Sequence, residues 1–328
     1  MKELYITDNE AGQRLDKLLA KYLRLAGKGF LYKMIRKKNI TLNGKRCEGS
    51  EKLKTGDRVC LYLSDDTIQK FSGAPEAAGQ PRPRTRLEIL YEDPHMLLIN
   101  KPAGMLSQKA APEDVSLVEY LTSYLLDTGA LAEEDLRAFR PSVCSRLDRN
   151  TTGLIAAGKS LAGLQILSEA FRSRTLSKYY LCVVCGAVTE PMRLDGYLEK
   201  DPAANQVSVF RQPAPGRSRI LTEYEPVDRT EGYTLLKVRL ITGKTHQIRA
   251  HLASAGHPIA GDPRYGDPKD CRRLRQQTGI GSQLLHSWKL VFPQMPAPLE
   301  HISGRSFQAP LPETFRQICP RWTADLEL

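Results

Sequence analysis

The stretch 64–85 most constrains how this chain can fold, because it interrupts every apolar pattern. It is built from Ser, Gly, Ala, Gln and charged residues with three prolines, and it has few apolar side chains. A segment of this composition breaks helices and strands and cannot contribute a core. We interpret residues 64–85 as a flexible linker. It divides the chain into a small module, residues 1–63, and a large domain, residues 86–328.

The composition supports folded domains and indicates the kind of partner. Of the 328 residues, 41% are hydrophobic and 26% are charged, so the chain can bury a core and is not of the disordered class. The formal net charge is +11, from 48 Lys and Arg against 37 Asp and Glu. This excess predicts attraction to a polyanion, either a nucleic acid or an acidic membrane surface.

The expected location follows from the first residues and from the cysteine pattern. The first residues lack the basic start and apolar stretch of a signal peptide, and no segment is apolar for the length of a membrane span. Seven scattered cysteines, an odd number, suit a reducing compartment better than a disulfide framework. We therefore expect a cytoplasmic monomer that binds no membrane.

The small module has the pattern of two short helices and a small sheet. Apolar residues recur at helical spacing over 15–26 and again over 30–35. Asn43-Gly44 predicts a tight hairpin turn after Ile40-Thr41-Leu42, and alternation at 59–63 predicts a half-buried strand. The segment from Arg14 to Asp57 resembles the RNA-binding domain named after ribosomal protein S-four, which is a small α/β domain.

Basic side chains gather on the second predicted helix of the module and on the turn that follows it. They could form only a solvated charged face, but few acids lie among them, which favours contacts with phosphates. The predicted RNA-binding residues are Lys28, Lys33, Arg36, Lys37 and Lys38.

The large domain alternates strand and helix signals in no regular order. We therefore predict an α+β fold, in which helices flank a mixed, largely antiparallel sheet. Strands are expected at residues 87–91, 96–100, 178–185 and 233–240, and helices at 115–126 and 160–171. Leu284–Leu290 is expected to be a packing segment.

The segment Arg146-Leu147-Asp148-Arg149 carries the most distinctive chemistry of the large domain. It places a carboxylate between two arginines, on a loop between apolar segments. An isolated Arg-Leu-Asp would most often form an Asx-type turn, with Asp148 bound to backbone amides. Catalytic groups also concentrate on loops of this kind.

Neither the cysteines nor the histidines of the large domain have the spacing of a metal site. Cys182 and Cys185 lack a second pair of ligands, and as strand residues they point to opposite faces. His246 and His251 are five residues apart and do not share a helix face as a zinc pair would. We expect no bound metal.

Five elements of the large domain, in this order, resemble the RluA-type RNA pseudouridine synthases. They are Asn100-Lys101-Pro102-Ala103-Gly104, Arg146-Leu147-Asp148 with Thr152-Gly153, Lys178-x-Tyr180, Thr245-His246-Gln247-Ile248-Arg249-x-His251, and Leu285-His286. The chain departs from the family pattern at two positions, because Ser145 stands where many members have His and Lys244 where Arg is common. Neither is the family's catalytic position.

The resemblance implies an isomerase that turns uridine into pseudouridine without a cofactor. It assigns Asp148 as the nucleophile or charge stabiliser and Arg249 as the guanidinium that keeps Asp148 ionised and oriented. Tyr180 would stack on the extruded base, and its hydroxyl would be a candidate base. Arg146 would fill the space vacated in the RNA. The remaining predicted substrate-binding residues are Lys101, His246 and Gln247.

The partner implied is structured RNA, and the small module favours ribosomal RNA of the large subunit. Transfer RNA is the alternative substrate. A non-catalytic RNA-binding protein of ribosome assembly is an alternative function that the same basic module would serve. A hydrolase would need a nucleophile elbow or a metal-spaced histidine pair, and the sequence has neither.

Overall fold

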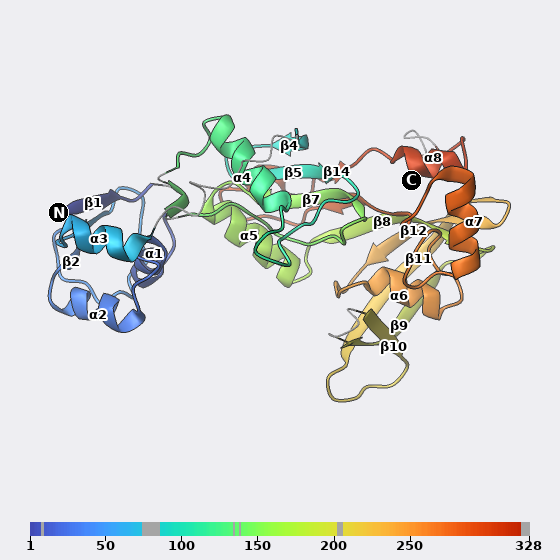
Figure 1. The fold of residues 1–328 in the computed structure, drawn as a ribbon, viewed down its shortest axis with the longest axis horizontal. Coiled ribbons are helices and arrows are strands. Elements are labelled where there is room, and N and C mark those ends of the chain that lie inside the picture. The colour runs from blue at the N-terminus through green and yellow to red at the C-terminus, as the bar shows by residue number, and fades with distance from the viewer. Residues whose placement is uncertain (8–9, 74–85, 134, 138, 202–205, 323–328) are drawn as a thin grey trace.

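The computed structural model shows a small N-terminal module beside a larger part built on a long sheet (Figure 1). It describes residues 1–7, 10–73, 86–133, 135–137, 139–201 and 206–322. Its α-helices are α1 (Leu15–Tyr22), α2 (Lys28–Arg36), α3 (Asp65–Ser72), α4 (Leu117–Asp127), α5 (Leu161–Arg172), α6 (Gln247–Ser254), α7 (Pro268–Thr278) and α8 (Glu313–Ile318). Within these ranges, no helix has both the length and the apolar composition needed to cross a bilayer.

The small module is built as the apolar pattern predicts. Helices α1 and α2 form, and strand β2 (Ile40–Leu42) pairs with β3 (Arg58–Leu61). Asn43 and Gly44 have φ values of 52° and 72°, the left-handed backbone that the predicted tight turn requires. Strand β1 (Lys2–Tyr5) was not predicted, and it completes a three-stranded sheet in the order β1-β3-β2.

The linker prediction is wrong for residues 65–72, which form helix α3. Ser64 caps the helix by accepting a hydrogen bond from the Thr67 amide, and acids occupy the first turn. Ile68 is buried in the core of the module, and Phe71 packs against Phe30 with ring centroids 4.3 Å apart. Two apolar side chains on one short helix therefore suffice to dock it. Residues 74–85 of the predicted linker lie outside the described residues.

The second sheet confirms the prediction of a mixed, largely antiparallel sheet with flanking helices. Its main path runs β10-β9-β11-β12-β8-β13-β7-β5-β4, with β14 beside β13 and β6 beside β7. Every pair is antiparallel except β13 with β7. The strands are β4 (Glu88–Glu92), β5 (Met96–Lys101), β6 (Ser142–Val143), β7 (Thr152–Gly158), β8 (Ser177–Cys185), β9 (Met192–Asp201), β10 (Gln206–Phe210), β11 (Ser218–Thr230), β12 (Tyr233–Leu240), β13 (Leu285–Val291) and β14 (Ser306–Gln308).

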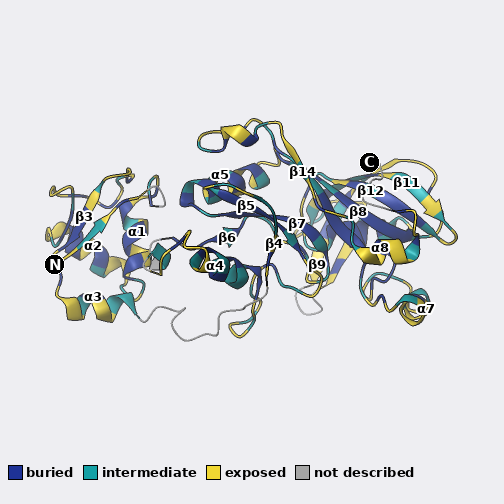
Figure 2. Ribbon diagram, turned by 90° about the horizontal axis from the view of Figure 1, so that it is seen from above, coloured by how far each residue is buried: buried dark blue, intermediate teal, exposed yellow. Residues whose placement is uncertain are grey.

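Helices α4 and α5 cover opposite faces of the half that contains β4, β5 and β7 (Figure 2). Successive side chains of a strand point to opposite faces. Leu97 and Ile99 of β5 accordingly belong to one core cluster with α4, whereas Met96 and Leu98 belong to another with α5. Strands β5 and β7 are therefore buried on both faces, and they are almost continuously apolar.

Strand β13 joins the two halves of the long sheet. It lies between β8, to which it is antiparallel, and β7, to which it is parallel. The expectation that residues 284–290 pack in the interior is confirmed by their burial, but it missed that the segment is a central strand. Because both faces of β13 are covered, its sequence shows no alternation that would reveal a strand.

Candidate active site

A cavity of about 760 Å³ opens between the loop that precedes β7, the start of β8 and the start of α6. Asp148 is the one acidic side chain among the described residues that line it. Its basic lining residues are Lys109, Arg146, Arg149, Arg172, Arg174, Lys178, Lys200, Lys244 and Arg249. A hollow with this charge suits an anionic ligand.

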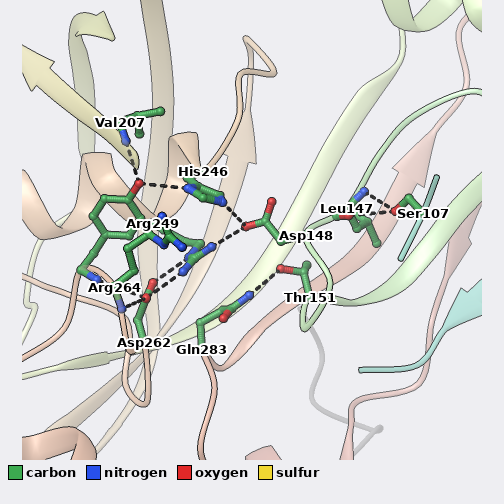
Figure 3. Close-up of polar contacts among 11 residues, drawn as sticks. Ser107, Leu147, Asp148, Thr151, Val207, His246, Arg249, Asp262, Arg264 and Gln283 are labelled. Carbon is green, nitrogen blue, oxygen red and sulfur yellow. Dashed lines mark hydrogen bonds and ion pairs between the residues drawn. The ribbon is translucent and has the colours of Figure 1, made fainter. Parts of the chain in front are cut away.

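Hydrogen bonds from neighbouring segments fix the loop that carries Asp148. The Ser107 hydroxyl donates to the Leu147 carbonyl at 2.8 Å and accepts from the Leu147 amide at 2.9 Å. The Asp148 carbonyl accepts the Thr151 amide at 3.0 Å, and the Gln283 side chain donates to the Thr151 hydroxyl at 3.3 Å (Figure 3). The backbone on both sides of Asp148 is thus fixed, which limits the directions its side chain can take.

Lys101 does not line the cavity but lies fully buried under this loop. Its ammonium donates to three backbone carbonyls, those of Pro102, Met105 and Arg149, at 2.8–2.9 Å. Burial lowers its pKa to about 8, although the charge of Asp148 opposes this change. Because all three ammonium hydrogens are already used, Lys101 offers no free donor to a ligand in this structure.

The second residue of β7 has to be glycine. Gly153 has a φ of 101°, and a Cβ added there would lie 2.2 Å from the Ser287 carbonyl oxygen of β13. Only a residue without a Cβ allows this close approach. Next to it, the Thr152 hydroxyl bonds to the ring of the fully buried His286 at 2.8 Å. His286 is therefore part of the seam between β7 and β13.

Arg249 divides its donors between two carboxylates (Figure 3). Its Nη1 donates to Asp148 Oδ2 at 2.8 Å, while Nε and Nη2 bind both oxygens of Asp262 at 2.7 and 2.8 Å. Asp262 is fully buried and Arg249 is 5% exposed. The planar fork of a guanidinium permits this arrangement, which a lysine could not reproduce.

The ion pairs keep Arg249 charged in spite of its burial. Burial by itself would lower the pKa of Arg249, but the hydrogen bonds and charge of Asp262, with those of Asp148, raise it above its ordinary value. Asp148 Oδ1 has no hydrogen-bond partner within the described ranges, in contrast to Oδ2. One carboxylate oxygen is thus anchored and the other is available to a ligand.

His246 lies on the same side of Asp148 as this ion pair, next to the oxygen that Arg249 binds (Figure 3). Its Nε2 is 3.9 Å from Asp148 Oδ2, and its Nδ1 is 3.0 Å from the Tyr265 hydroxyl. That hydroxyl accepts the Val207 amide at 3.0 Å, so its own hydrogen is available to Nδ1. Burial lowers the pKa of His246, and the charge of Asp148 opposes the change only in part. We therefore expect a neutral ring that carries its proton on Nε2, toward Asp148.

Gln247 lines the cavity wall, yet both ends of its amide are engaged by the protein. The carbonyl accepts from the Thr242 hydroxyl and the Lys244 amide, and the amide nitrogen donates to Leu221 and Thr222. These bonds fix the start of α6, where His246 adopts a left-handed φ of 52°. Gln247 thus positions its neighbours instead of offering free groups to a substrate, which replaces its predicted role.

Tyr180 lines the same cavity from β8 and is 7% exposed. Burial raises its pKa to about 12, although a hydrogen bond with Ser287 acts in the other direction. The charge of Asp148 also acts on Tyr180, so the two side chains are close enough to interact. Arg146 lines the cavity as an exposed side chain on the Asp148 loop.

The predicted RNA-binding cations lie far from this cavity along the chain, on α2 and the turn after it. Lys28, Lys33, Arg36, Lys37 and Lys38 are all exposed. In the part of the chain that the structure describes, none of them forms an ion pair. They are therefore free to contact an external anion.

Comparisons with known proteins agree with this geometry. A family model described as RNA pseudouridylate synthase matches residues 95–254, and the S4 domain model matches residues 13–59. The ribosomal large subunit pseudouridine synthase C of Vibrio parahaemolyticus is 31% identical over 294 residues, which covers 88% of this chain and 87% of that protein. The chain belongs to the RNA pseudouridylate synthase family. Its Escherichia coli relative of the same name is 31% identical over 308 residues, covering 89% of this chain and 88% of that protein.

A solved structure of the same family has the same fold. Human RNA pseudouridylate synthase domain containing 4 aligns with a TM-score of 0.56 and 21% sequence identity, and the alignment covers 70% of this chain and 90% of that one. The resemblance drawn from the sequence motifs is thus confirmed, as is the presence of an S4 domain.

Three residues of this pseudouridylate synthase site were missed from its sequence. Asp262 stands close after the His-Gln-Ile-Arg motif but was assigned no role, and neither were Ser107 and Tyr265. Asp262 follows Gly261, whose φ of 74° marks a tight turn in the segment after α6. A Gly-Asp pair after a helix with a buried arginine was the available signal. The other two have no local signal, since their partners are distant in the chain.

Proposed function

We propose that the protein isomerises specific uridines to pseudouridine in large-subunit ribosomal RNA, with Asp148 as the group that acts on the target nucleotide. The observation that carries this proposal is the asymmetric environment of its carboxylate. Oδ2 is bound to Arg249 at 2.8 Å, while Oδ1 has no partner in the described residues and lies on a cavity lined by basic groups. An ionised carboxylate with one free oxygen suits a nucleophile or a stabiliser of positive charge.

The reaction requires no outside donor or acceptor of electrons. The bond between uracil N1 and ribose C1′ breaks, a bond between C5 and C1′ forms, C5 loses a proton and N1 gains one. The buried guanidinium of Arg249 holds one oxygen of Asp148, and the neutral His246 presents an N–H toward the same oxygen. Attack on the sugar and attack on the ring are both compatible with this arrangement.

Tyr180 supports the reaction by stacking. The target base leaves its own stack at a cost of a few kcal/mol, and an aromatic ring returns roughly 1–3 kcal/mol per base. The Tyr180 phenol has a pKa of about 12, so it stays protonated near neutral pH and is poorly suited to act as the base. Arg146, exposed at the mouth of the cavity, is placed to contact the RNA from which the nucleotide is withdrawn.

The choice of ribosomal RNA rests on the relatives and on the basic helix. The names of the relatives specify the large ribosomal subunit, and the S4 match overlaps α2 with its exposed cations. Transfer RNA and a purely RNA-binding role in ribosome assembly are the alternatives to be tested.

The test is to incubate the purified protein with large-subunit ribosomal RNA transcripts and with transfer RNA, and to map pseudouridine chemically. We expect modification of ribosomal RNA at discrete sites. Asp148→Asn should reduce the single-turnover rate by at least about 100-fold while RNA binding persists. Asp270→Asn is the matched control, because Asp270 also pairs with an arginine but lies outside the cavity.

Each outcome decides between the candidates. Equal modification by the wild type and by Asp148→Asn would remove Asp148 from the mechanism. Modification of transfer RNA alone would replace the ribosomal substrate. Tight binding with no pseudouridine on any RNA would favour the assembly role.

A further inference from the structure

Lys178, at the start of β8, is a buried cation without a counter-ion. Its side chain lines the cavity, and the residue is only 9% exposed. Within the described ranges its ammonium takes part in no hydrogen bond and no salt bridge. The stem of this side chain is buried, and its unpaired ammonium opens onto the cavity. The position of this ammonium in the cavity wall indicates that its counter-ion belongs to a bound ligand.

Among the residues that the structure describes, none pairs with Lys178 as a counter-ion. The exposed Arg174 is the charged group that acts on it, and its charge is of the same sign. Asp148 is the single acid among the described lining residues, and its Oδ2 is committed to Arg249. Burial and the charge of Arg174 together lower the pKa of Lys178. Binding of an anion would oppose both effects.

The wall next to Lys178 leaves room for a ligand. Gly243 also lines the cavity, and a Cβ added there would lie 3.3 Å from the Lys178 ammonium. A side chain at 243 would press on the ammonium, which lies at the end of a flexible stem and would have to move by a few tenths of an ångström. The glycine therefore keeps the approach to this charge open.

The position of Lys178 relative to Tyr180 identifies the group that would bind. The two residues are separated by one position on β8, so their side chains share a face about 6–7 Å apart along the strand. In a nucleotide, the base and the phosphate are likewise separated by one ribose. A base stacked on Tyr180 would thus bring a backbone phosphate near Lys178.

We propose that Lys178, assisted by Arg174, binds a phosphodiester of the RNA strand adjacent to the extruded nucleotide. This inference rests on the proposed function and deepens it, because it assigns the site for the backbone of the target nucleotide. The phosphate neutralises the buried ammonium, and the ammonium fixes the distance between the backbone and the tyrosine ring. Lys178 is then a substrate-binding residue of the cavity.

The probe is the segment of large-subunit ribosomal RNA that the full-length protein protects from nuclease. It is synthesised with single methylphosphonate linkages, which remove the charge of one phosphate at a time. Equilibrium affinity is measured in the Asp148→Asn background, which needs no turnover, and the single-turnover rate is measured in the otherwise wild-type protein. The variants are Lys178→Met and Lys178→Arg, with Lys269→Met as the control at an exposed lysine outside the cavity.

We expect Lys178→Met to weaken binding of the native RNA by about 10- to 100-fold, as for a hydrogen bond to a charged group. Lys178→Arg should restore most of the affinity, and Lys269→Met should leave it unchanged. One methylphosphonate linkage should weaken wild-type binding by the same factor and have no further effect on Lys178→Met. The thermal midpoint of Lys178→Met should equal or exceed that of the wild type, because an unpaired buried charge has been removed.

Two results would overturn the proposal. The first is that every methylphosphonate weakens binding by the same factor in Lys178→Met as in the wild type. Lys178 would then contact none of the phosphates tested. If Lys178→Met instead lowers the thermal midpoint and leaves affinity intact, the residue has a structural role only. Absence of pseudouridine in every RNA would refute the proposed activity, whereas the binding cycle would still decide on the phosphate contact.

Discussion

At the scale of single residues, the site depends on how one guanidinium is shared. Arg249 holds one oxygen of Asp148 and both oxygens of Asp262. Asp262 also accepts the backbone amides of Arg264 and Tyr265 at 2.9 and 3.2 Å, which fixes its carboxylate. The direction of Asp148 is therefore set by a residue that lies behind Arg249, away from the ligand.

Asp262→Asn should reduce the single-turnover rate by about 10- to 100-fold without weakening RNA binding. The amide can receive only one of the two guanidinium bonds, so Arg249 loses its orientation and Asp148 loses its anchor. Rapid-quench pseudouridine assays and RNA titrations would separate the two effects. Asp270→Asn serves as the control, and an equal loss of affinity in Asp262→Asn would contradict a purely positioning role.

Lys101 predicts a pH dependence of stability. Its pKa is about 8 in the folded protein against 10.5 as the ordinary value, so between these pH values the unfolded chain binds more protons. Titration of Lys101 should therefore raise the free energy of unfolding with pH in this window, by up to about 1.4 kcal/mol per pH unit. Urea titrations from pH 7.5 to 10.5 would show a more positive slope in the wild type than in Lys101→Met. Identical slopes would refute the perturbed pKa.

The family motifs contain both residues that line the cavity and residues whose polar groups are bound inside the protein. Asp148, Arg249 and Tyr180 were proposed from family motifs, and the structure brings them to one cavity. Lys101 and Gln247 belong to the same motifs, but their polar groups are all bound within the protein. A motif therefore identifies residues that matter to a site without separating those that face the ligand from those that hold the loop. That distinction arises only from burial and tertiary hydrogen bonds.

At the scale of elements, periodicity predicted some amphipathic segments and missed others, among them helices α3 and α7 and the alternating strand β11. Helices α1, α2, α4 and α5 each have one apolar face, and each was predicted. Strands β9 and β10 are exposed over much of their length, and β13 is buried on both faces. Strand β13 shows no alternation because both of its faces are covered, whereas β10 does alternate over Gln206-Val207-Ser208-Val209 and was still missed.

Helix α3 yields a prediction for the small module. Phe71→Ala should destabilise the module by about 1–3 kcal/mol, because the ring packs on Phe30 and closes one side of its core. Hydrogen exchange of the α1 and α2 amides in the full-length protein would report the change. Gln69→Ala, at an exposed position of the same helix, is the control, since Lys70 lies over the Phe71 ring. Unchanged exchange in Phe71→Ala would show that α3 does not stabilise the module.

At the scale of the whole molecule, charge is divided between two places. The exposed cations of α2 and its following turn form one, and the basic lining of the cavity forms the other. The first can contact phosphates anywhere along an RNA, whereas under the proposed mechanism the second would surround the reacting nucleotide. We expect the first to govern the salt dependence of affinity and the second to govern the rate.

Replacement of Lys33, Arg36 and Lys37 by glutamine should weaken RNA binding and reduce its salt dependence. For each phosphate that is no longer bound, the slope of log affinity against log salt should fall in magnitude by roughly 0.7–0.9. The single-turnover rate at saturating RNA should not change, because these residues do not line the cavity. Titrations at several salt concentrations would test this, and an unaltered slope would remove α2 from the RNA interface.

The central place of β13 has a consequence for how the protein is made. Asp148 is supplied by the loop before β7 and Tyr180 by β8, and the strand between them is translated more than a hundred residues after Tyr180. While the chain is still being synthesised, β7 and β8 have no common neighbour to hold them in register. We therefore expect a growing polypeptide to be inactive on RNA until β13 has been synthesised and has paired with both strands.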